Sequence, residues 1–344
     1  MSLPPVEIPL GAMRFNSDSS KVEYWMGSAW MQIQTFSPNL DGGARAVFHS
    51  GRTSSGSDVN VIDYITISTQ GNAIDFGDST QSTEANNLST ISSRTRALYG
   101  GGYQHPSLGH HDQIGFITFS STGNSADFGN LTQSRRAIGG VSNATRGVFM
   151  GGLSPTVRDT IDFVTIASTG NAVDFGNTTA VRSSSSGVSS PVRGVLTGDN
   201  MLNMDFITIA STGNAQDFGD DVVKTYNPSG VSNSTRGLFA GGAQVSPGAP
   251  INTIRQIFIA TLSNAFDFGD LGTTYRSKNG TASPTRGVFA GGRAPADSDS
   301  SPSGPQNIIE YVSMQTEGNA VDFGDLTVAR YEHAPMGNAH GGLG

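Results

Sequence analysis

Six copies of one sixteen-residue cassette run through this chain, each consisting of a strand-like stretch, a turn and the motif Asp-Phe-Gly. The copies align without a gap and end at Gly77, Gly129, Gly176, Gly219, Gly269 and Gly324. A self-similar period of about 50 residues is typical of repeat architectures, in which each unit packs on its neighbours. We therefore expect the repeated residues to form the framework, and the function to reside in what the repeats do not share.

A second repeated element reads approximately Thr-Arg-Gly-Val-Phe-Ala-Gly-Gly. From each Asp of Asp-Phe-Gly to the following Arg the separation is 21 residues once and 19 residues four times, whereas from each Arg to the next such Asp it varies between 24 and 36. Length variation is thus confined to one loop per repeat. The residues predicted to be structural are Asp75, Phe76, Asp127, Phe128, Asp174, Phe175, Asp217, Phe218, Asp267, Phe268, Asp322 and Phe323, together with Arg45, Arg96, Arg146, Arg193, Arg236 and Arg286.

The cassette predicts strands rather than helices. In the stretch IDFVTIAS of residues 161–168, β-branched and aromatic residues alternate with small polar ones, as in a half-buried strand. Thr-Gly-Asn then tolerates positive φ angles and favours a tight hairpin. The Arg-Gly element predicts a third strand, and the 19-residue spacing leaves room for a fourth. With 45 glycines in 344 residues and no amphipathic helical pattern, we expect an all-β fold.

Four short antiparallel strands per unit describe the blades of a β-propeller better than they describe a sandwich or a solenoid. Residues 21–34 and 325–340 each look like part of a further unit, and together they would form a seventh blade. The chain length of 344 residues divided by seven is close to the observed repeat, which favours seven blades. The alternative is a six-bladed ring with the N-terminal hairpin as an attachment peg.

The order of these elements resembles the kelch repeat of galactose-oxidase-like propellers. In one repeat, Gly151-Gly152, Asp162-Phe163, Phe175 and Arg193 hold the places of the kelch Gly-Gly, acidic-aromatic, aromatic and Arg residues, with Phe where kelch repeats usually carry Trp. The resemblance covers roughly residues 40–330 and implies a propeller of four-stranded blades. It implies little about function, because one fold carries many activities.

The N-terminal stretch is similar to a short module of tailed-phage fibre and appendage proteins. The residues that carry this similarity are Gly11, Arg14, Phe15, Asn16, Glu23, Trp25, Gly27, Ser28 and Trp30. The cassette ITIASTGNAxDFGD likewise resembles repeats in virion proteins of marine phages, particularly those that infect cyanobacteria. We therefore interpret residues 1–35 as an N-terminal module, which could belong to the closing blade, and residues 36–344 as the propeller.

These resemblances imply a virion protein of the tail, fibre or capsid surface, assembled in the bacterial host cytoplasm. The expected partners are other virion proteins, bound through the N-terminal module, and a polysaccharide or receptor on the host surface. We also expect several copies on each particle.

The variable loops, residues 53–60, 103–113, 153–160, 199–203, 243–253 and 293–307, should gather on one face of a propeller. A rigid scaffold that holds divergent loops suits binding. The alternative is that insertions collect there because nothing depends on them. The candidate binding residues are Tyr103, His105, His110, His111, Asp112, Arg158, Gln244, Arg293, Asp297 and Asp299.

Two loop clusters contain groups that can bind metals. The histidines and Asp112 of residues 103–113 include zinc and nickel ligands, but they lack a fixed ligand spacing. Residues 297–300 are rich in Asp, yet no Glu or turn Gly follows at EF-hand spacing. We predict solvated loops at both places, with no metal and no cofactor.

Composition excludes several classes of function. The net charge of −8 opposes binding to nucleic acids or anionic membranes. Cysteine is absent, which excludes disulfides, thiolate metal sites and Cys nucleophiles. No apolar stretch approaches the length of a membrane span, and the start lacks the basic and apolar regions of a signal peptide.

We predict a non-enzymatic protein that mediates attachment to the host. The alternative is a depolymerase that degrades polysaccharide on a propeller scaffold. Hydrolysis of a glycosidic bond needs two carboxyl groups that face each other across a pocket, and the unshared acids cannot be paired from the sequence.

Overall fold

The computed structural model describes residues 8–16, 21–32, 44–80, 89–104, 109–244, 249–294 and 304–344. The chain divides into two compact units, Met1–Leu40 and Asp41–Gly344. The described residues of both units are organised into β-strands, and their one helix is the 3-10 turn η1 (Gly341–Leu343). The prediction of an all-β fold is confirmed.

The described residues of the larger unit form six four-stranded antiparallel sheets, here numbered sheets 1 to 6. Sheet 1 contains β7 (Ser89–Ser92), β8 (Arg96–Gly100), β11 (Gln113–Thr118) and β12 (Ala126–Asn130); sheet 2 contains β13 (Gly139–Ser142), β14 (Arg146–Met150), β17 (Thr160–Thr165) and β18 (Val173–Asn177); sheet 3 contains β19 (Ser185–Ser189), β20 (Arg193–Gly198), β21 (Asn203–Thr208) and β22 (Gln216–Asp220).

The other three sheets have the same strand order. Sheet 4 contains β23 (Ser229–Ser232), β24 (Arg236–Ala240), β25 (Ile251–Phe258) and β26 (Phe266–Tyr275); sheet 5 contains β27 (Asn279–Ala282), β28 (Arg286–Ala290), β31 (Ile308–Ser313) and β32 (Val321–Asp325); sheet 6 contains β33 (Ala334–Gly337), β4 (Arg45–His49), β5 (Val61–Thr66) and β6 (Ile74–Asp78). This is a propeller-like arrangement.

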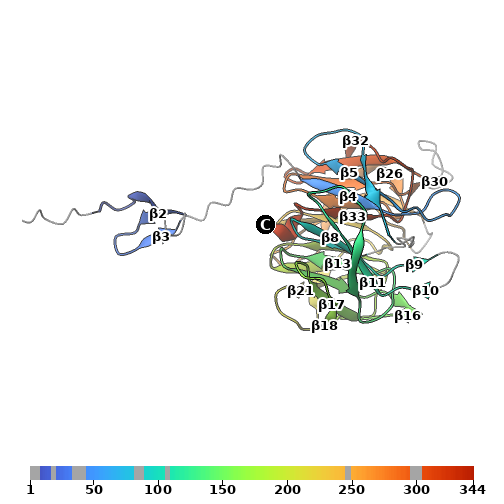
Figure 1. Ribbon diagram of the computed structural model, residues 1–344, viewed down its shortest axis with the longest axis horizontal. Coiled ribbons are helices and arrows are strands. Elements are labelled where there is room, and N and C mark those ends of the chain that lie inside the picture. The colour runs from blue at the N-terminus through green and yellow to red at the C-terminus, as the bar shows by residue number, and fades with distance from the viewer. Residues whose placement is uncertain are drawn as a thin grey trace, which may run out of the picture. The chain divides into compact units, whose positions relative to one another are not determined.

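Sheet 6 combines distant parts of the chain. Its first strand, β33, pairs with β4 (Figure 1). In this pairing Met336 lies opposite Val47. The sequence predicts that residues 21–34 join residues 325–340 in a seventh blade, but residues 21–32, the described part of that stretch, form strands of the N-terminal unit. Among the described strands, β33 is the one that pairs with β4 on this side, and it supplies the hydrogen bonds that an open sheet edge lacks. The four-stranded sheets among the described residues therefore number six.

The Asp-Phe-Gly motif forms a β-bulge in the fourth strand of every sheet. In sheet 1, Gly129 lies opposite Ile114 and Asp127 opposite Gly115, so Phe128 is the extra residue between them. A bulge turns this residue out of the regular alternation. Phe128 is consequently buried although the residues on both sides are not, and Gly129 has a φ of +150°.

The six phenylalanines of this motif pack between consecutive sheets. Phe128 of sheet 1 lies in one apolar cluster with Phe149 and Val164 of sheet 2. Five more clusters of the same kind follow, and the last joins Phe76 of sheet 6 to Phe119 of sheet 1. The first strands also contact one another from sheet to sheet, including β33 with β7. The apolar core therefore lies between the sheets.

Three of the connections from second to third strand carry small two-stranded extensions. They are β9 (Tyr103–Gln104) with β10 (Gly109–His110), β15 (Leu153–Ser154) with β16 (Thr156–Val157), and β29 (Arg293–Ala294) with β30 (Gly304–Pro305). These extensions belong to the loops whose length varies between repeats. The links between sheets leave at the same end of the strands as these loops, which we call the loop face.

The N-terminal unit contains a three-stranded antiparallel sheet of β1 (Met13–Asn16), β2 (Lys21–Trp25) and β3 (Trp30–Gln32). On one side Arg14 forms an ion pair with buried Glu23 at 2.8 Å and lies over the Trp30 ring. Because side chains alternate along a strand, Met13 and Phe15 belong to the opposite side, where both are exposed.

Candidate binding site at the loop face

The repeated arginines connect each sheet to the next. Arg146 of sheet 2 donates a hydrogen bond from Nη1 to the carbonyl oxygen of Ile209, just beyond the third strand of sheet 3, at 3.0 Å. Its guanidinium lies 4.3 Å from the ring centroid of Phe163 in its own sheet. The corresponding pairs are Arg45 with Phe119, Arg96 with Ala167, Arg193 with Ile259, Arg236 with Met314 and Arg286 with Ile67.

The aspartates of Asp-Phe-Gly are exposed, and the repeated Asn makes the bond to the neighbouring sheet. Asn171 Oδ1 accepts a hydrogen bond from the backbone N–H of Asn130, at 3.1 Å. Equivalent bonds join Asp78 to Asn124, Asn177 to Asn214, Asp220 to Asn264, Asp270 to Asn319 and Asp325 to Asn72. These residues hold the face opposite the loop face.

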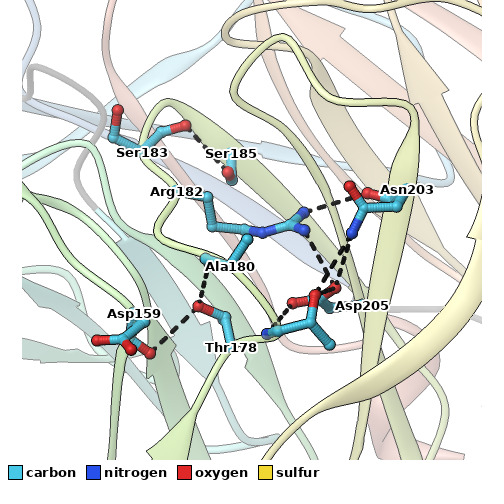
Figure 2. Close-up of polar contacts among 9 residues, drawn as sticks. Asp159, Thr178, Ala180, Arg182, Ser183, Ser185, Asn203 and Asp205 are labelled. Carbon is cyan, nitrogen blue, oxygen red and sulfur yellow. Dashed lines mark hydrogen bonds and ion pairs between the residues drawn. The ribbon is translucent and has the colours of Figure 1, made fainter.

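On the loop-face side, buried ion pairs tie links to third strands. Arg182, in the link after β18, contacts Asp205 of β21 at 3.0 Å, and both side chains are fully buried (Figure 2). Thr179 donates to Asp205 from both its backbone N–H and its hydroxyl. Burial lowers the pKa of Arg182, and Asp205 counteracts this. The same pairing joins Arg135 to Asp162 and Arg330 to Asp63.

In two sheets the buried pair consists of other residues but still joins an acid to a base. In sheet 4 the third strand carries Arg255 and the link carries Asp221, so the charges are exchanged. In sheet 5, Lys278 and Glu310 form the pair at 2.7 Å. The sequence analysis missed the link residues. Aligning the repeats does not find all of them, because Arg182 stands six residues after Gly176, whereas Asp221 stands two after Gly219 and Lys278 nine after Gly269.

In sheet 1 an aromatic side chain replaces the ion pair. Gly115 stands at the acidic position, and the ring of Tyr99 fills the space that a side chain there would need. The Tyr99 hydroxyl bonds Ser125 at 2.8 Å, and its ring stacks on His49 at 3.9 Å. Burial lowers the pKa of His49 to about 3, so this imidazole is neutral.

A cavity of about 100 Å³ lies between the first strands of the six sheets. Its lining includes Ser186, Ser229 and Asn279 near the loop face. Neighbouring strands approach so closely that a Cβ on Gly187 would collide with the carbonyl oxygen of Gly140. Among the described residues that line the cavity none is acidic, and its one titratable side chain is His340. The cavity is therefore neutral and rich in hydroxyl and amide groups.

Residues 338–344 lie at the other end of this cavity. His340 Nε2 is 3.0 Å from the carbonyl oxygen of Ser92 and 3.3 Å from the hydroxyl of Ser142. Burial lowers the pKa of His340 to about 4, so it is neutral and donates to Ser92. η1 contacts β13, β19 and β23. Access from solvent is therefore expected at the loop face.

At the loop face, each described link has a residue with positive φ shortly before the first strand: Ala137, Ser184, Asn227, Ser277 and Glu332. Asn227 lines the cavity, and the backbone N–H of Glu332 bonds to Ser277 at 3.4 Å. Glu332 is not itself a lining residue, but the next residue, His333, accepts a hydrogen bond from Asn279, which lines the cavity. Non-glycine residues with positive φ are uncommon and often mark functional sites.

Arginines and tyrosines surround Glu332. Arg52 and Arg293 lie over the ring of Tyr331, at 6.0 and 5.7 Å from its centroid. Arg136 lies 4.8 Å from the ring centroid of Tyr103. We call Arg52, Arg136, Arg293, Tyr103 and Tyr331 the arginine-tyrosine cluster.

The carboxyl group of Glu332 is exceptional within this cluster. Its Oε2 atom is buried and has no hydrogen-bond partner among the described residues. Burial raises the pKa of Glu332 to about 7, although Arg52, Arg136 and Arg293 counteract this. Glu332 is therefore partly protonated near neutral pH.

The structure brings three predicted binding residues into this region. Tyr103 and Arg293 belong to the cluster, and His110 packs edge-on against Tyr103 at 5.5 Å. His111 and Asp112 follow in the same loop, where their backbone groups bond Gly102 and Leu131. Sequence reasoning missed Arg52, Arg136, Tyr331 and Glu332.

The remaining candidates lie apart or are not described. Arg158 donates to the carbonyl oxygen of Ser154 at 2.8 Å and so closes its own loop. The backbone N–H of Gln244 bonds Ala249 across another loop. His105, Asp297 and Asp299 lie outside the described residues. Within the described part of the chain, no three metal-binding side chains lie together.

Comparison with known proteins gives no assignment: no protein-family model matches the chain, and no curated protein matches it. Within the described ranges, no helix has the length and apolar character needed to cross a bilayer.

Proposed function

We propose that the larger unit is a closed six-bladed β-propeller and that the chain is a non-enzymatic virion protein of a tailed phage. Closure is supported by contacts repeated from sheet to sheet, since Arg286 of sheet 5 bonds Ile67 beside sheet 6, and Arg45 of sheet 6 bonds Phe119 beside sheet 1. The fibre-like N-terminal stretch and the resemblance of the cassette to repeats in phage virion proteins support the choice of protein class. The expected location is the virion, in several copies.

The loop face mediates attachment to the bacterial host. The observation that carries this proposal is the arginine-tyrosine cluster, which lies on the face where the repeats diverge. The opposite face is built from bonds common to all six sheets. A surface that differs between repeats on a uniform scaffold suits the recognition of one ligand.

Attachment is tested with fluorescent protein and host cells. Wild-type protein is expected to bind the cells, and purified phage is expected to compete with it. A double variant at cluster residues that do not pack in the core, Arg136→Ser with Arg293→Ser, tests whether the cluster is used. If the wild-type protein binds no host cell and is absent from purified particles, the proposed function is wrong.

A depolymerase remains the second candidate because of one carboxyl group. Glu332 has the raised pKa that a general acid needs. The second carboxyl group that hydrolysis requires would be that of Asp58, which acts on Glu332 and lies 3.7 Å from Arg52. Incubation with host polysaccharide, followed by measurement of new reducing ends, separates the two functions. We expect none; release of sugar by the wild type and not by Glu332→Gln would establish the enzyme.

The N-terminal unit attaches the protein to other virion proteins. Its sheet leaves Met13, Phe15 and Met31 exposed, and a three-stranded sheet of this size needs an apolar partner surface for stability. Deletion of residues 1–35 is expected to abolish incorporation into particles while the propeller keeps its circular dichroism spectrum. Incorporation of the truncated protein at the wild-type level would contradict this docking role.

A further inference from the structure

The cluster concentrates positive charge on an acidic protein. The chain has 28 Asp and Glu residues against 20 Lys and Arg, yet three arginines act electrostatically on the single Glu332 carboxyl group. Among the described residues, Asp58 is the one other acid that acts on it. Among the described charged groups that act on Glu332, the positive ones therefore outnumber the negative ones.

Two of these arginines have unused hydrogen-bonding capacity. Arg136 and Arg293 make no ion pair and no side-chain hydrogen bond with any described residue; each instead lies over a tyrosine ring. A guanidinium presents its N–H groups in a planar fork that matches carboxylate and phosphate oxygens. The tyrosine beneath it limits its freedom and offers an apolar ring face.

The lining of the cavity between the first strands favours neutral hydroxyl groups. Ser229 is 1% exposed and lines the cavity, and its Oγ atom has no partner among the described residues. Asn279 uses its amide Nδ2 for the carbonyl oxygen of His333, at 2.7 Å, so this side chain is held in place. A buried hydroxyl without a partner costs free energy that a ligand hydroxyl can recover.

We propose that the loop face binds an acidic saccharide, with its carboxylate or phosphate on Arg136 and Arg293 and its neutral hydroxyls at the cavity entrance. This inference rests on the proposed attachment function and specifies its ligand. Tyr103 and Tyr331 stack against the sugar rings. The neutral cavity distinguishes this site from one for a free inorganic anion.

Glu332 makes the binding depend on pH. The charged groups that act on it are Arg52 and Asp58 from the loop of sheet 6, Arg293 from the loop of sheet 5 and Arg136 from the link before sheet 2. An ionised Glu332 competes with the ligand anion for these arginines, whereas a protonated one does not. Affinity should therefore rise as pH falls through about 7.

The test is calorimetric titration of the full chain with oligogalacturonate, with a phosphorylated mannan oligosaccharide, and with the fully methyl-esterified oligogalacturonate. At least one acidic probe is expected to bind, and the neutral ester is expected not to. Whichever acidic probe binds identifies carboxylate or phosphate as the preferred group. Inorganic phosphate alone should bind at least about tenfold more weakly, because it cannot use the hydroxyl contacts.

Single substitutions test which side chains bind the saccharide. Arg136→Gln and Arg293→Gln should each weaken binding by roughly 10- to 100-fold, as loss of charge-assisted hydrogen bonds does. Arg158→Gln is the matched control, since Arg158 is a loop-face arginine that bonds its own loop, and it should leave affinity unchanged. Glu332→Gln should retain binding and lose the pH dependence.

Several results would overturn the inference. They are failure of both acidic probes to bind, equal binding of the methyl ester, and equal loss in the Arg158→Gln control. If the protein attaches to host cells but acidic saccharides do not compete, the ligand assignment is wrong while attachment stands. If it does not attach to cells at all, the proposed function itself fails.

Discussion

Arg255 and Asp221 form the buried ion pair of sheet 4 with the charges exchanged relative to Arg182 and Asp205 of sheet 3. The acid stands on the third strand in sheet 3 and in the link in sheet 4. What is preserved is therefore a buried pair of opposite charges between link and third strand, although Asp221 and Arg182 stand at different positions of their links. Burying one of these charges alone is costly, because the interior cannot solvate it.

Removing one partner of such a pair should destabilise the protein strongly. We expect Arg182→Met to lower the free energy of unfolding by about 3–5 kcal/mol, because it leaves Asp205 buried without its counter-ion. The double variant with Asp205→Leu should recover most of this loss. Urea denaturation measures the free energy of unfolding of each variant. Equal values for the single and double variants would contradict the pairing of Arg182 with Asp205.

The bulge glycines should tolerate no side chain. Gly129 has a φ of +150°, and a Cβ there would collide with the carbonyl oxygen of Gly170 in the next sheet. We expect Gly129→Ala to cost roughly 2–4 kcal/mol in thermal or urea unfolding. Gly170→Ala is the control, since nothing lies within 4 Å of a Cβ at that position. Similar losses in both variants would show that the contact is unimportant.

Acid should unfold the protein through its buried histidines. Burial lowers the pKa values of His49 and His333 to about 3, below the value of 6.5 for an exposed histidine. Their contribution to stability is thus complete above pH 6.5 and is lost as pH falls towards 3. Each group adds about 1.4 kcal/mol per pH unit to the slope in that range.

The variant His49→Phe tests this directly, because Phe keeps the stacking on Tyr99 and cannot be protonated. Its stability should fall less steeply with acid than that of the wild type. An unchanged slope for His49→Phe would mean that His49 is not the titrating group.

A disulfide across sheet 6 should test the junction of distant chain segments. Val47 and Met336 lie opposite each other on β4 and β33, and the chain has no other cysteine. We expect Val47→Cys with Met336→Cys to form a disulfide on oxidation and to gain roughly 2–4 kcal/mol over its reduced form. Mass spectrometry and denaturation with and without reductant measure both effects. Absence of the disulfide would contradict the pairing of these strands.

The strands and their repetition could be predicted from local pattern. Alternation of apolar and polar residues within the cassette reports which side of a strand is buried, and that information lies within a few neighbouring residues. The motif Asp-Phe-Gly recurred often enough to be recognised as framework. Its structural role as a bulge, with Phe128 turned between two sheets, depends on the opposite strand and was not predictable from the motif.

The site depended on the tertiary structure. Tyr103 and Arg293 were predicted from variable loops, but Glu332 and Arg136 stand in links that sequence spacing marked as regular. They meet because the links converge where the first strands gather around the cavity. Similarly, β33 pairs with β4 and not with the N-terminal strands. A sheet edge forms hydrogen bonds with whichever strand lies beside it in space, however distant that strand is in the sequence. The sequence by itself determined the strands and their sixfold repetition, since both are local properties, whereas the strand partners, the burial of charges and the grouping of arginines were decided by long-range packing.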